Sequence, residues 1–337
     1  MSIIRSYQNA FELTDLTPEL LLVPNQWGLV NELGIFREEG VTQHSVTVEI
    51  SNGTLSVISD QPRGARNNVN KDDNRALRAL AIPHFPLDDY ITPQDIQGKR
   101  AYGSDAAETE AAVTARKIER IRMNHAVTLE AARCRAITTG DIYAPNGTVV
   151  GNFYSEFGVT RKEIDFVLGT AGTNVLEKGE EAIAHIQDNI LSGETVNSVS
   201  VLCSPEFFAK LIKQAGVVDA YKYYTSTQEP NRARLGTGLH RRFVHGGIEY
   251  IEYRGSYNGQ KLIPAGDAYA MPMGTVDTFV TYYSPANKFD LVNTIGEAAY
   301  LFSYRDAKGE KIELQSEHNA LNLVRRPACL VRLFSSN

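Results

Sequence analysis

The feature that most constrains this 337-residue chain is one helical pattern that begins near Ser104 and continues without a proline to Gly140. Ser104 or Asp105 is expected to cap the helix, and Gly140 stands where a helix stop is expected. At 1.5 Å per residue the helix is roughly 50 Å long, which exceeds the diameter of a compact domain. We therefore expect an elongated molecule, and helices of this length are more common in assemblies than around catalytic pockets.

One face of this helix is apolar. Its residues recur at spacings of three and four, which predicts a stripe that packs on another part of the chain: Ile118, Ile121, His125, Leu129, Ala132 and Ala136. The charged residues of the segment lie mostly off this stripe: Arg116, Glu119, Arg120, Glu130 and Arg133. Cys134 follows His125 by nine residues, which places the two on opposite faces, so we interpret His125 as a packed core residue rather than half of a Cys–His nucleophile pair.

Composition excludes several classes of protein. Hydrophobic residues make up 42% and charged residues 22%, which is ordinary for a globular protein with an ample core. A net charge of −6 gives no general affinity for nucleic acid, and no apolar stretch is long enough to cross a bilayer. The three cysteines are far apart and odd in number, which favours buried thiols in a reducing compartment: Cys134, Cys203 and Cys329.

Residues 1–40 have the pattern of an arm. A short helix is expected to start at Thr17 and Pro18 and to end at Pro24, and a second amphipathic piece places Trp27, Val30, Leu33 and Phe36 on one side. These pieces are too short to bury themselves. They must dock either on the core of the same chain or on a neighbouring subunit.

Residues 46–59 alternate between apolar and polar, which predicts a hairpin that turns at Asn52 and Gly53 and returns through Leu55 and Val57. The polar residues 61–75 that follow predict an extended hairpin or a long loop. Its cations could bind phosphate, but aspartates dilute the charge, and a solvated or subunit-bridging loop is favoured over a phosphate site with Arg63, Arg66, Lys71, Arg75 and Arg78.

The remaining pattern predicts two lobes that share the long helix, in an α+β fold. A connector, residues 82–103, has a helix start at Thr92 and Pro93. A hairpin at 142–150 and strand segments at 152–161 and 164–168 follow the long helix. Helices and strands then alternate: helix 175–191, strand 196–203, a helix from 204 to a stop at Gly216, irregular chain at 221–240, and strands 248–253 and 275–283. The last region predicts a hairpin that turns at residues 306–309 and a third strand at 328–334.

No group of residues predicts catalysis, so we expect no catalytic, cofactor or metal site and no enzyme activity. Residues 169–172 lack the Lys-Ser of a phosphate loop, and the adjacent pairs Asp88–Asp89 and Glu180–Glu181 point their side chains apart. The seven histidines show no metal-ligand spacing. The alternative is an α/β enzyme with a substrate site among the tyrosines and arginines of residues 221–242.

Two segments carry a family resemblance. Residues 262–274 and 296–333 are similar to the phage major capsid protein E family, typified by the phage lambda head protein. The shared features are a strand pair from Ala299, a turn with Asp306, a Gln-Ser-x-x-Asn stretch at 315–319, and Arg326-Pro327 before an apolar strand. Residues 83–103 also resemble the family's approach to its long helix.

The resemblance implies an α+β, HK97-like phage capsid fold. Its parts map to an N-terminal arm at 1–40, an E-loop at 41–81, and a peripheral domain at 82–169 with a spine helix at 105–139. An axial α/β domain maps to 170–290, and residues 291–337 map to C-terminal strands that return to the peripheral domain.

The implied function is that of the major capsid protein of a tailed phage or prophage. Such a protein self-assembles as hexamers and pentamers into an icosahedral shell, which encloses double-stranded DNA that it contacts non-specifically. The implied partners are other copies of the chain, a scaffolding protein, a portal and a decoration protein, with no membrane. The implied location is the virion, with assembly in the host cytoplasm.

Two further possibilities attach to this fold. The alternative function is the shell of an encapsulin-like compartment. Some relatives with the fold form a Lys–Asn cross-link between subunits. Lys71 is the candidate lysine for such a cross-link here, although the E family is not generally known for cross-links of this kind.

Overall fold

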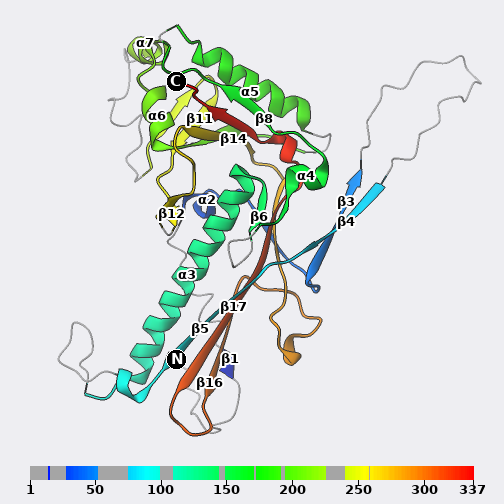
Figure 1. Cartoon of the computed structure of the whole chain (residues 1–337), viewed down its shortest axis with the longest axis vertical. Helices are drawn as coiled ribbons and strands as arrows, with labels where there is room; N and C mark the ends of the chain where they lie inside the picture. The colour runs from blue at the N-terminus through cyan, green and yellow to red at the C-terminus, as the bar shows by residue number, and fades with distance from the viewer. Residues whose placement is uncertain are drawn as a thin grey trace, which may run out of the picture.

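Helix α3, Glu110–Thr138, runs along one side of an elongated, two-lobed molecule in the computed structural model (Figure 1). The structure describes residues 14–15, 28–51, 75–98, 109–143, 149–170, 172–190, 194–224, 240–257 and 259–337. The predicted caps Ser104 and Asp105 lie outside these residues, and the expected start is wrong: Thr109 is the N-cap, and its Oγ1 accepts from the Ala112 N–H at 3.2 Å. The helix therefore has 29 residues, or about 44 Å. The predicted stop is confirmed, since Gly140 adopts φ 74°.

The first six-stranded sheet lies against α3 and is built around a long C-terminal strand, β17 (Ile312–Val324). β16 (Tyr300–Arg305) and β5 (His84–Ile91) pair antiparallel with its first part, and β15 (Phe279–Tyr283) with its second part. β1 (Thr14–Asp15) pairs with β16, and β2 (Arg37–Gly40) runs parallel to β15. The β16–β17 turn is where the sequence predicts it, because the Gly309 N–H donates to the Asp306 carbonyl at 2.8 Å.

The apolar stripe of α3 packs on this sheet as predicted. Ile118 and Ile121 are buried against Ile91, Leu301 and Leu314. Leu129 packs farther along, against Tyr283 and Ala320.

The second six-stranded sheet has the order β10-β11-β9-β14-β18-β8. Its strands are β8 (Lys162–Asp165), β9 (Ser198–Cys203), β10 (Arg242–His245), β11 (Ile248–Glu252), β14 (Asp267–Met273) and β18 (Val331–Phe334). Helices α5 (Val175–Asn189), α6 (Pro205–Leu211) and α7 (Ala215–Tyr224) belong to the same lobe (Figure 1). Its core contains fully buried Phe166, Phe207 and Tyr250.

Two strands belong to a different sheet from the one expected. β18 follows the short helix η3 (Pro327–Cys329) and pairs with β14 and β8, so the expectation that all of residues 291–337 return to the sheet beneath α3 is wrong for this strand. β15 falls within residues 170–290 but pairs in the first sheet. The chain passes between the sheets three times, after β5, after β14 and after β17.

The projecting hairpin also differs from its prediction. β3 (Ser45–Ser51) pairs antiparallel with β4 (Arg75–Ala81), in register from Ser45 opposite Ala81 to Ser51 opposite Arg75. The described partner of β3 is therefore β4, more than twenty residues farther along the chain, while the turn expected at Asn52 and Gly53 and the return through Leu55 and Val57 lie outside the described residues. Residues 52–74, with Arg63, Arg66 and Lys71, lie outside the described residues.

Short elements account for the other differences. Asn152 accepts from the Tyr154 N–H and starts helix α4 (Phe153–Phe157) where a strand was expected. α7 contains Gly216, the expected helix stop, and continues to Tyr224. The hairpin β6 (Asp141–Tyr143) with β7 (Val149–Asn152) is confirmed, and so is the start at Thr92 of η1 (Pro93–Asp95), which has a Thr92–Asp95 capping box.

Of the arm, the structure describes Thr14–Asp15 and the part from Gly28, while the helix expected between Thr17 and Pro24 lies outside the described residues, as does Trp27. Short helix α2 (Leu29–Glu32) buries Leu29 and Val30, and Phe36 is buried with them. This part docks on the core of its own chain.

Candidate functional site

Two charged residues of α3 are buried where the two lobes meet. Glu130 is 3% exposed and Arg133 is 4% exposed, although periodicity places both mostly off the apolar stripe. The Glu130 carboxylate accepts the backbone N–H groups of Val30 and Asn31, each at 2.9 Å. It therefore caps α2, whose own N-cap residue, Gly28, has no side chain to do so.

Tyr253, which follows β11 in the second lobe, is a third hydrogen-bond donor to the Glu130 carboxylate. Its hydroxyl donates to Glu130 Oε1 at 2.6 Å. Burial raises the pKa of Glu130, and the hydrogen bonds from Tyr253, Val30 and Asn31 oppose that rise. Burial and the Glu130 charge both raise the pKa of the Tyr253 phenol, so the phenol keeps its proton and acts as the donor.

Close approach at this junction requires a glycine at residue 28. Gly28 adopts φ 94°, and a methyl group there would lie 2.2 Å from Glu130 Cδ. Any other residue would suffer backbone strain and displace the capping carboxylate.

Arg133 ties the arm to the sheet from the same helix. Its guanidinium donates to Asn31 Oδ1 at 2.9 Å, to Glu38 Oε1 at 2.8 Å and to Thr281 Oγ1 at 3.1 Å. It also lies over the Phe36 ring, 5.3 Å from the centroid. We call Gly28, Glu130, Arg133 and Tyr253, with the groups they bind, the spine junction. Its contacts join the arm, α3, β15 and the second lobe.

His125 is a packed residue, as its place on the apolar stripe predicts. Ser316 donates its hydroxyl to the Leu87 carbonyl, so His125 Nε2 is the donor in its 2.9 Å hydrogen bond to Ser316 Oγ. His318 lies beside it, with ring centroids 5.7 Å apart. Burial lowers the pKa of His125 to about 3 and that of His318 to about 4, so both are neutral at pH 7.

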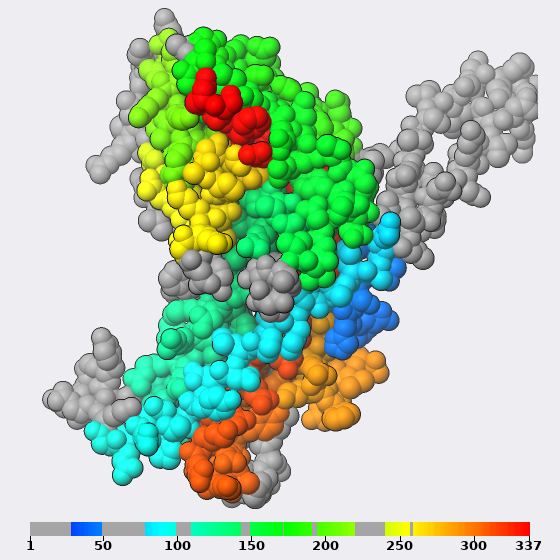
Figure 2. Space-filling view, in the orientation of Figure 1, coloured from blue at the N-terminus to red at the C-terminus, as the bar shows by residue number. Residues whose placement is uncertain are grey.

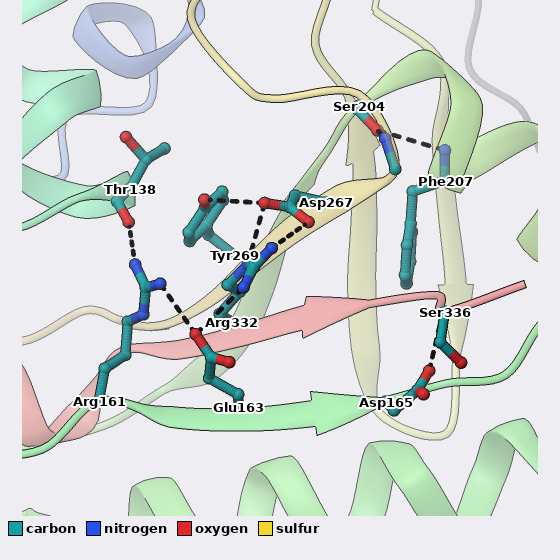
Figure 3. A network of polar contacts seen from close by, with 11 residues as sticks. Thr138, Arg161, Glu163, Asp165, Ser204, Phe207, Asp267, Tyr269, Arg332 and Ser336 are labelled. Carbon is teal, nitrogen blue, oxygen red and sulfur yellow. Dashed lines mark hydrogen bonds and ion pairs between the residues drawn. The ribbon is translucent and has the colours of Figure 1, made fainter.

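A second polar network joins the end of α3 to the second sheet (Figure 3). Arg332 on β18 binds both carboxylate oxygens of Asp267 on β14, at 2.9 and 3.0 Å, and Glu163 on β8 at 3.1 Å. Arg161 donates to the same Glu163 and to the Thr138 carbonyl at 2.7 Å. The hydrogen bond from Arg161 is the main cause that lowers the pKa of Glu163. These three strands are therefore fixed to the helix end.

The hairpin β3–β4 extends away from both lobes (Figure 1). Within the described part of the chain it pairs with no strand of either large sheet. Val46 and Val48 rest partly buried on the core, while Thr47 and Arg78 are exposed. Beyond this contact the ribbon pairs only with itself, and an isolated two-stranded ribbon has little stability of its own.

The acidic and thiol side chains that were considered for catalysis and rejected are paired or buried. Asp89 accepts from Lys117 at 2.8 Å, Glu181 pairs with Lys162 at 2.9 Å, and Cys134 is fully buried, which raises the pKa of its thiol. Of residues 221–242, where the alternative enzyme site was expected, the structure describes 221–224 and 240–242, and there Arg241 and Arg242 pair with Glu252 and Glu249.

Metal and membrane features were sought in the same described residues. No three His, Cys, Asp or Glu side chains gather there in a way that could hold a metal ion. Nor does any helix of this part of the chain combine the length and apolarity that a bilayer crossing needs.

The sequence matches the family described as phage major capsid protein E over residues 12–335. The major capsid protein of Pseudomonas phage KPP10 is 47% identical to this chain over 344 residues, which cover 98% of each protein. The major capsid protein of Salmonella phage Felix O1 is 27% identical and covers 97% of this chain and 96% of its own.

Solved capsid structures have the same architecture. The capsid chain of cyanophage P-SCSP1u matches with a TM-score of 0.54 at 12% identity, covering 100% of this chain and 93% of its own. A chain of the mature capsid of bacteriophage PhiM1 also gives 0.54, at 14% identity, covering 90% and 85%. At such low identity the likeness shows the fold alone, which is the expected α+β, HK97-like fold.

Proposed function

The chain belongs to the phage major capsid protein E family, and from this premise we propose that it assembles as hexamers and pentamers into an icosahedral shell around double-stranded DNA. A major capsid protein is a component of the virion that assembles from many copies of one chain. Both relatives named above are phage proteins, which does not favour an encapsulin-like compartment.

The observation that carries the proposal is the isolated ribbon β3–β4, which extends from a body whose two lobes are tied to one long helix. We assign residues 41–81 to an E-loop that lies over a neighbouring subunit and residues 1–40 to the arm. The sheet with α3 would form the peripheral domain. The sheet with β9 and β14 would form the axial domain, and it includes β8 and β18.

The rest of the role follows from this assignment. We propose a structural rather than an enzymatic function, with assembly in the host cytoplasm and with a scaffolding protein, a portal and a decoration protein as partners. The net charge of −6 supports weak, non-specific contact with packaged DNA rather than sequence-specific binding. Many modest contacts, repeated by symmetry, would stabilise the shell.

Negative-stain microscopy of the purified protein tests the proposal directly. We expect shells, tubes or ring-shaped capsomers, either alone or with the phage's scaffolding protein. Replacement of residues 52–74 by Asn-Gly is the matched variant, because a two-residue turn can close β3 on β4 and both lobes are left unchanged. We expect this variant to assemble less readily than the unsubstituted protein. Unsubstituted protein that stays monomeric under both conditions would contradict the proposal.

A further inference from the structure

Residues 285–296, between β15 and β16, place three large apolar side chains in solvent. Phe289 is 98% exposed, Ile295 is 68% exposed and Val292 is 61% exposed. We call this segment the apolar knob. A phenyl ring fully in water gains nothing for the stability of its own subunit, and clustered exposed apolar residues mark interaction sites.

The knob is held firmly rather than loosely. Lys288 donates to Tyr304 Oη at 2.7 Å and to Gln315 Oε1 at 2.8 Å, and its ammonium group also lies over the rings of Phe302 and Tyr304. Glu317 accepts the Asn287 N–H at 3.1 Å. Phe289 and Asp290 therefore begin η2 (Phe289–Leu291) on a segment fixed to β16 and β17, which lowers the entropy lost on binding.

The end of the knob is fixed to the base of the projecting ribbon. The Gly296 N–H donates to the Val41 carbonyl at 3.0 Å, and a methyl group at residue 296 would lie 2.2 Å from the Tyr283 carbonyl oxygen. An open groove of about 440 Å³ lies between residues 42–45 and 285–293. Figure 2 shows the knob (orange) as a protrusion beside the blue and cyan base of the ribbon.

The charges of the knob favour a protein as its partner. Its only lysine, Lys288, binds Tyr304 and Gln315, while Asp290 within the knob and Glu297 directly after it are exposed. An acidic and apolar surface repels DNA phosphates and anionic lipids.

We propose that the apolar knob is a contact between copies of this chain, with Phe289 as its central residue. The inference rests on the proposed function, because a shell of one chain requires each copy to bury surface on its neighbours. The knob adjoins the base of the ribbon that we assign to a neighbouring subunit, so the two would form one continuous interface. Phe289 has features of a hot spot: it is an exposed aromatic ring on a segment that hydrogen bonds of Asn287 and Lys288 hold in place.

The test places the photo-reactive amino acid p-benzoylphenylalanine at position 289 of the full chain. Irradiation of assembled particles should give covalent dimers of this chain on a denaturing gel. Particles that assemble but yield only monomer after irradiation, or cross-links only to a different protein, would overturn the contact and leave the proposed function standing. A chain that never associates, with or without the substitution, would overturn both.

A substitution series provides the second measurement. Phe289→Ser should raise the concentration required for assembly by at least about tenfold, and Phe289→Leu should restore most of the loss. Circular dichroism of the unassembled protein checks that both variants remain folded, which the exposure of the side chain leads us to expect. Equal assembly by the Ser variant, the Leu variant and the unsubstituted protein would contradict the proposal.

Discussion

The hydroxyl of Tyr253 donates a 2.6 Å hydrogen bond to the carboxylate of Glu130, a residue 123 positions earlier in the chain and on the other side of the junction between the lobes. Both side chains are buried, and the same carboxylate caps the arm helix α2. One ionisable group thus joins three elements that no local sequence pattern connects.

Replacement of Tyr253 by Phe should destabilise the protein. The variant keeps the ring but leaves one lone pair of a buried carboxylate without a donor, which costs about 2 kcal/mol. Urea unfolding of the unassembled protein measures the change. The matched control is Tyr90→Phe, since Tyr90 is 46% exposed and its ring contact with Lys311 survives. Equal stability of the two variants would contradict the role given to the hydroxyl.

Replacement of Gly28 by Ala should be more damaging than the same change at Gly34. Both glycines have positive φ, 94° and 58°, but a methyl group meets Glu130 at residue 28 and nothing within 4 Å at residue 34. We expect a loss of about 3 kcal/mol or more for Gly28→Ala and about 1 kcal/mol for Gly34→Ala. Thermal unfolding of both variants measures the difference, and losses of the same size would show that the clash with Glu130 relaxes freely.

The two buried histidines should make the fold sensitive to acid. Their pKa values in the folded protein, about 3 for His125 and about 4 for His318, lie below the ordinary value of 6.5, so the unfolded chain binds more protons below that pH. Their contribution to stability is complete above pH 6.5 and is lost as the pH falls toward 4. At pH 5 the free energy of unfolding should be lower than at pH 7.5 by about 2 kcal/mol for each histidine.

The free energy of unfolding at several pH values, in His125→Gln and in the unsubstituted chain, checks this dependence. The free energy of unfolding of the Gln variant should fall less between pH 7.5 and pH 5 than that of the unsubstituted chain. His44→Gln is the matched control, because His44 is exposed just before β3 and is not part of the buried pair. Identical declines in all three proteins would contradict the assignment to the buried pair.

Replacement of Arg332 by Lys should weaken the attachment of the last strand. The guanidinium binds Asp267 through two parallel hydrogen bonds and Glu163 through a third, a geometry that an ammonium group cannot reproduce. We expect a loss of about 1 kcal/mol and earlier hydrogen exchange of β18 amides. Arg254→Lys, at an ion pair whose arginine is 69% exposed, should change stability by less than about 0.5 kcal/mol.

Patterns within one element were predicted well from the sequence. Gly140 ends α3, Thr92 starts η1, and His125 faces the sheet because each depends on residues a few positions away. The family and its α+β capsid fold were also predicted, from motifs in order along the chain. The same local logic also led to errors, because Gly216 favours a helix stop while α7 continues through it to Tyr224, and Asn152 starts helix α4 where a strand was expected.

Glu130 and Arg133 could not be placed from periodicity. A charged residue is assigned to solvent because its burial alone is costly. The burial of Glu130 is favourable here because Val30, Asn31 and Tyr253, about 100 residues away on either side in the chain, donate hydrogen bonds to its carboxylate. The signal that could have pointed to them is the run of small residues around them in α3, since Ala126, Ala131 and Ala132 allow other backbone segments to approach the helix closely.

The chain passes between the sheets three times, after β5, β14 and β17, and this affects how the protein responds to proteolytic cleavage. Any single break in the backbone interrupts at most one passage, so two covalent links still hold the lobes together. A subunit cut once in its backbone would therefore keep its two lobes covalently joined.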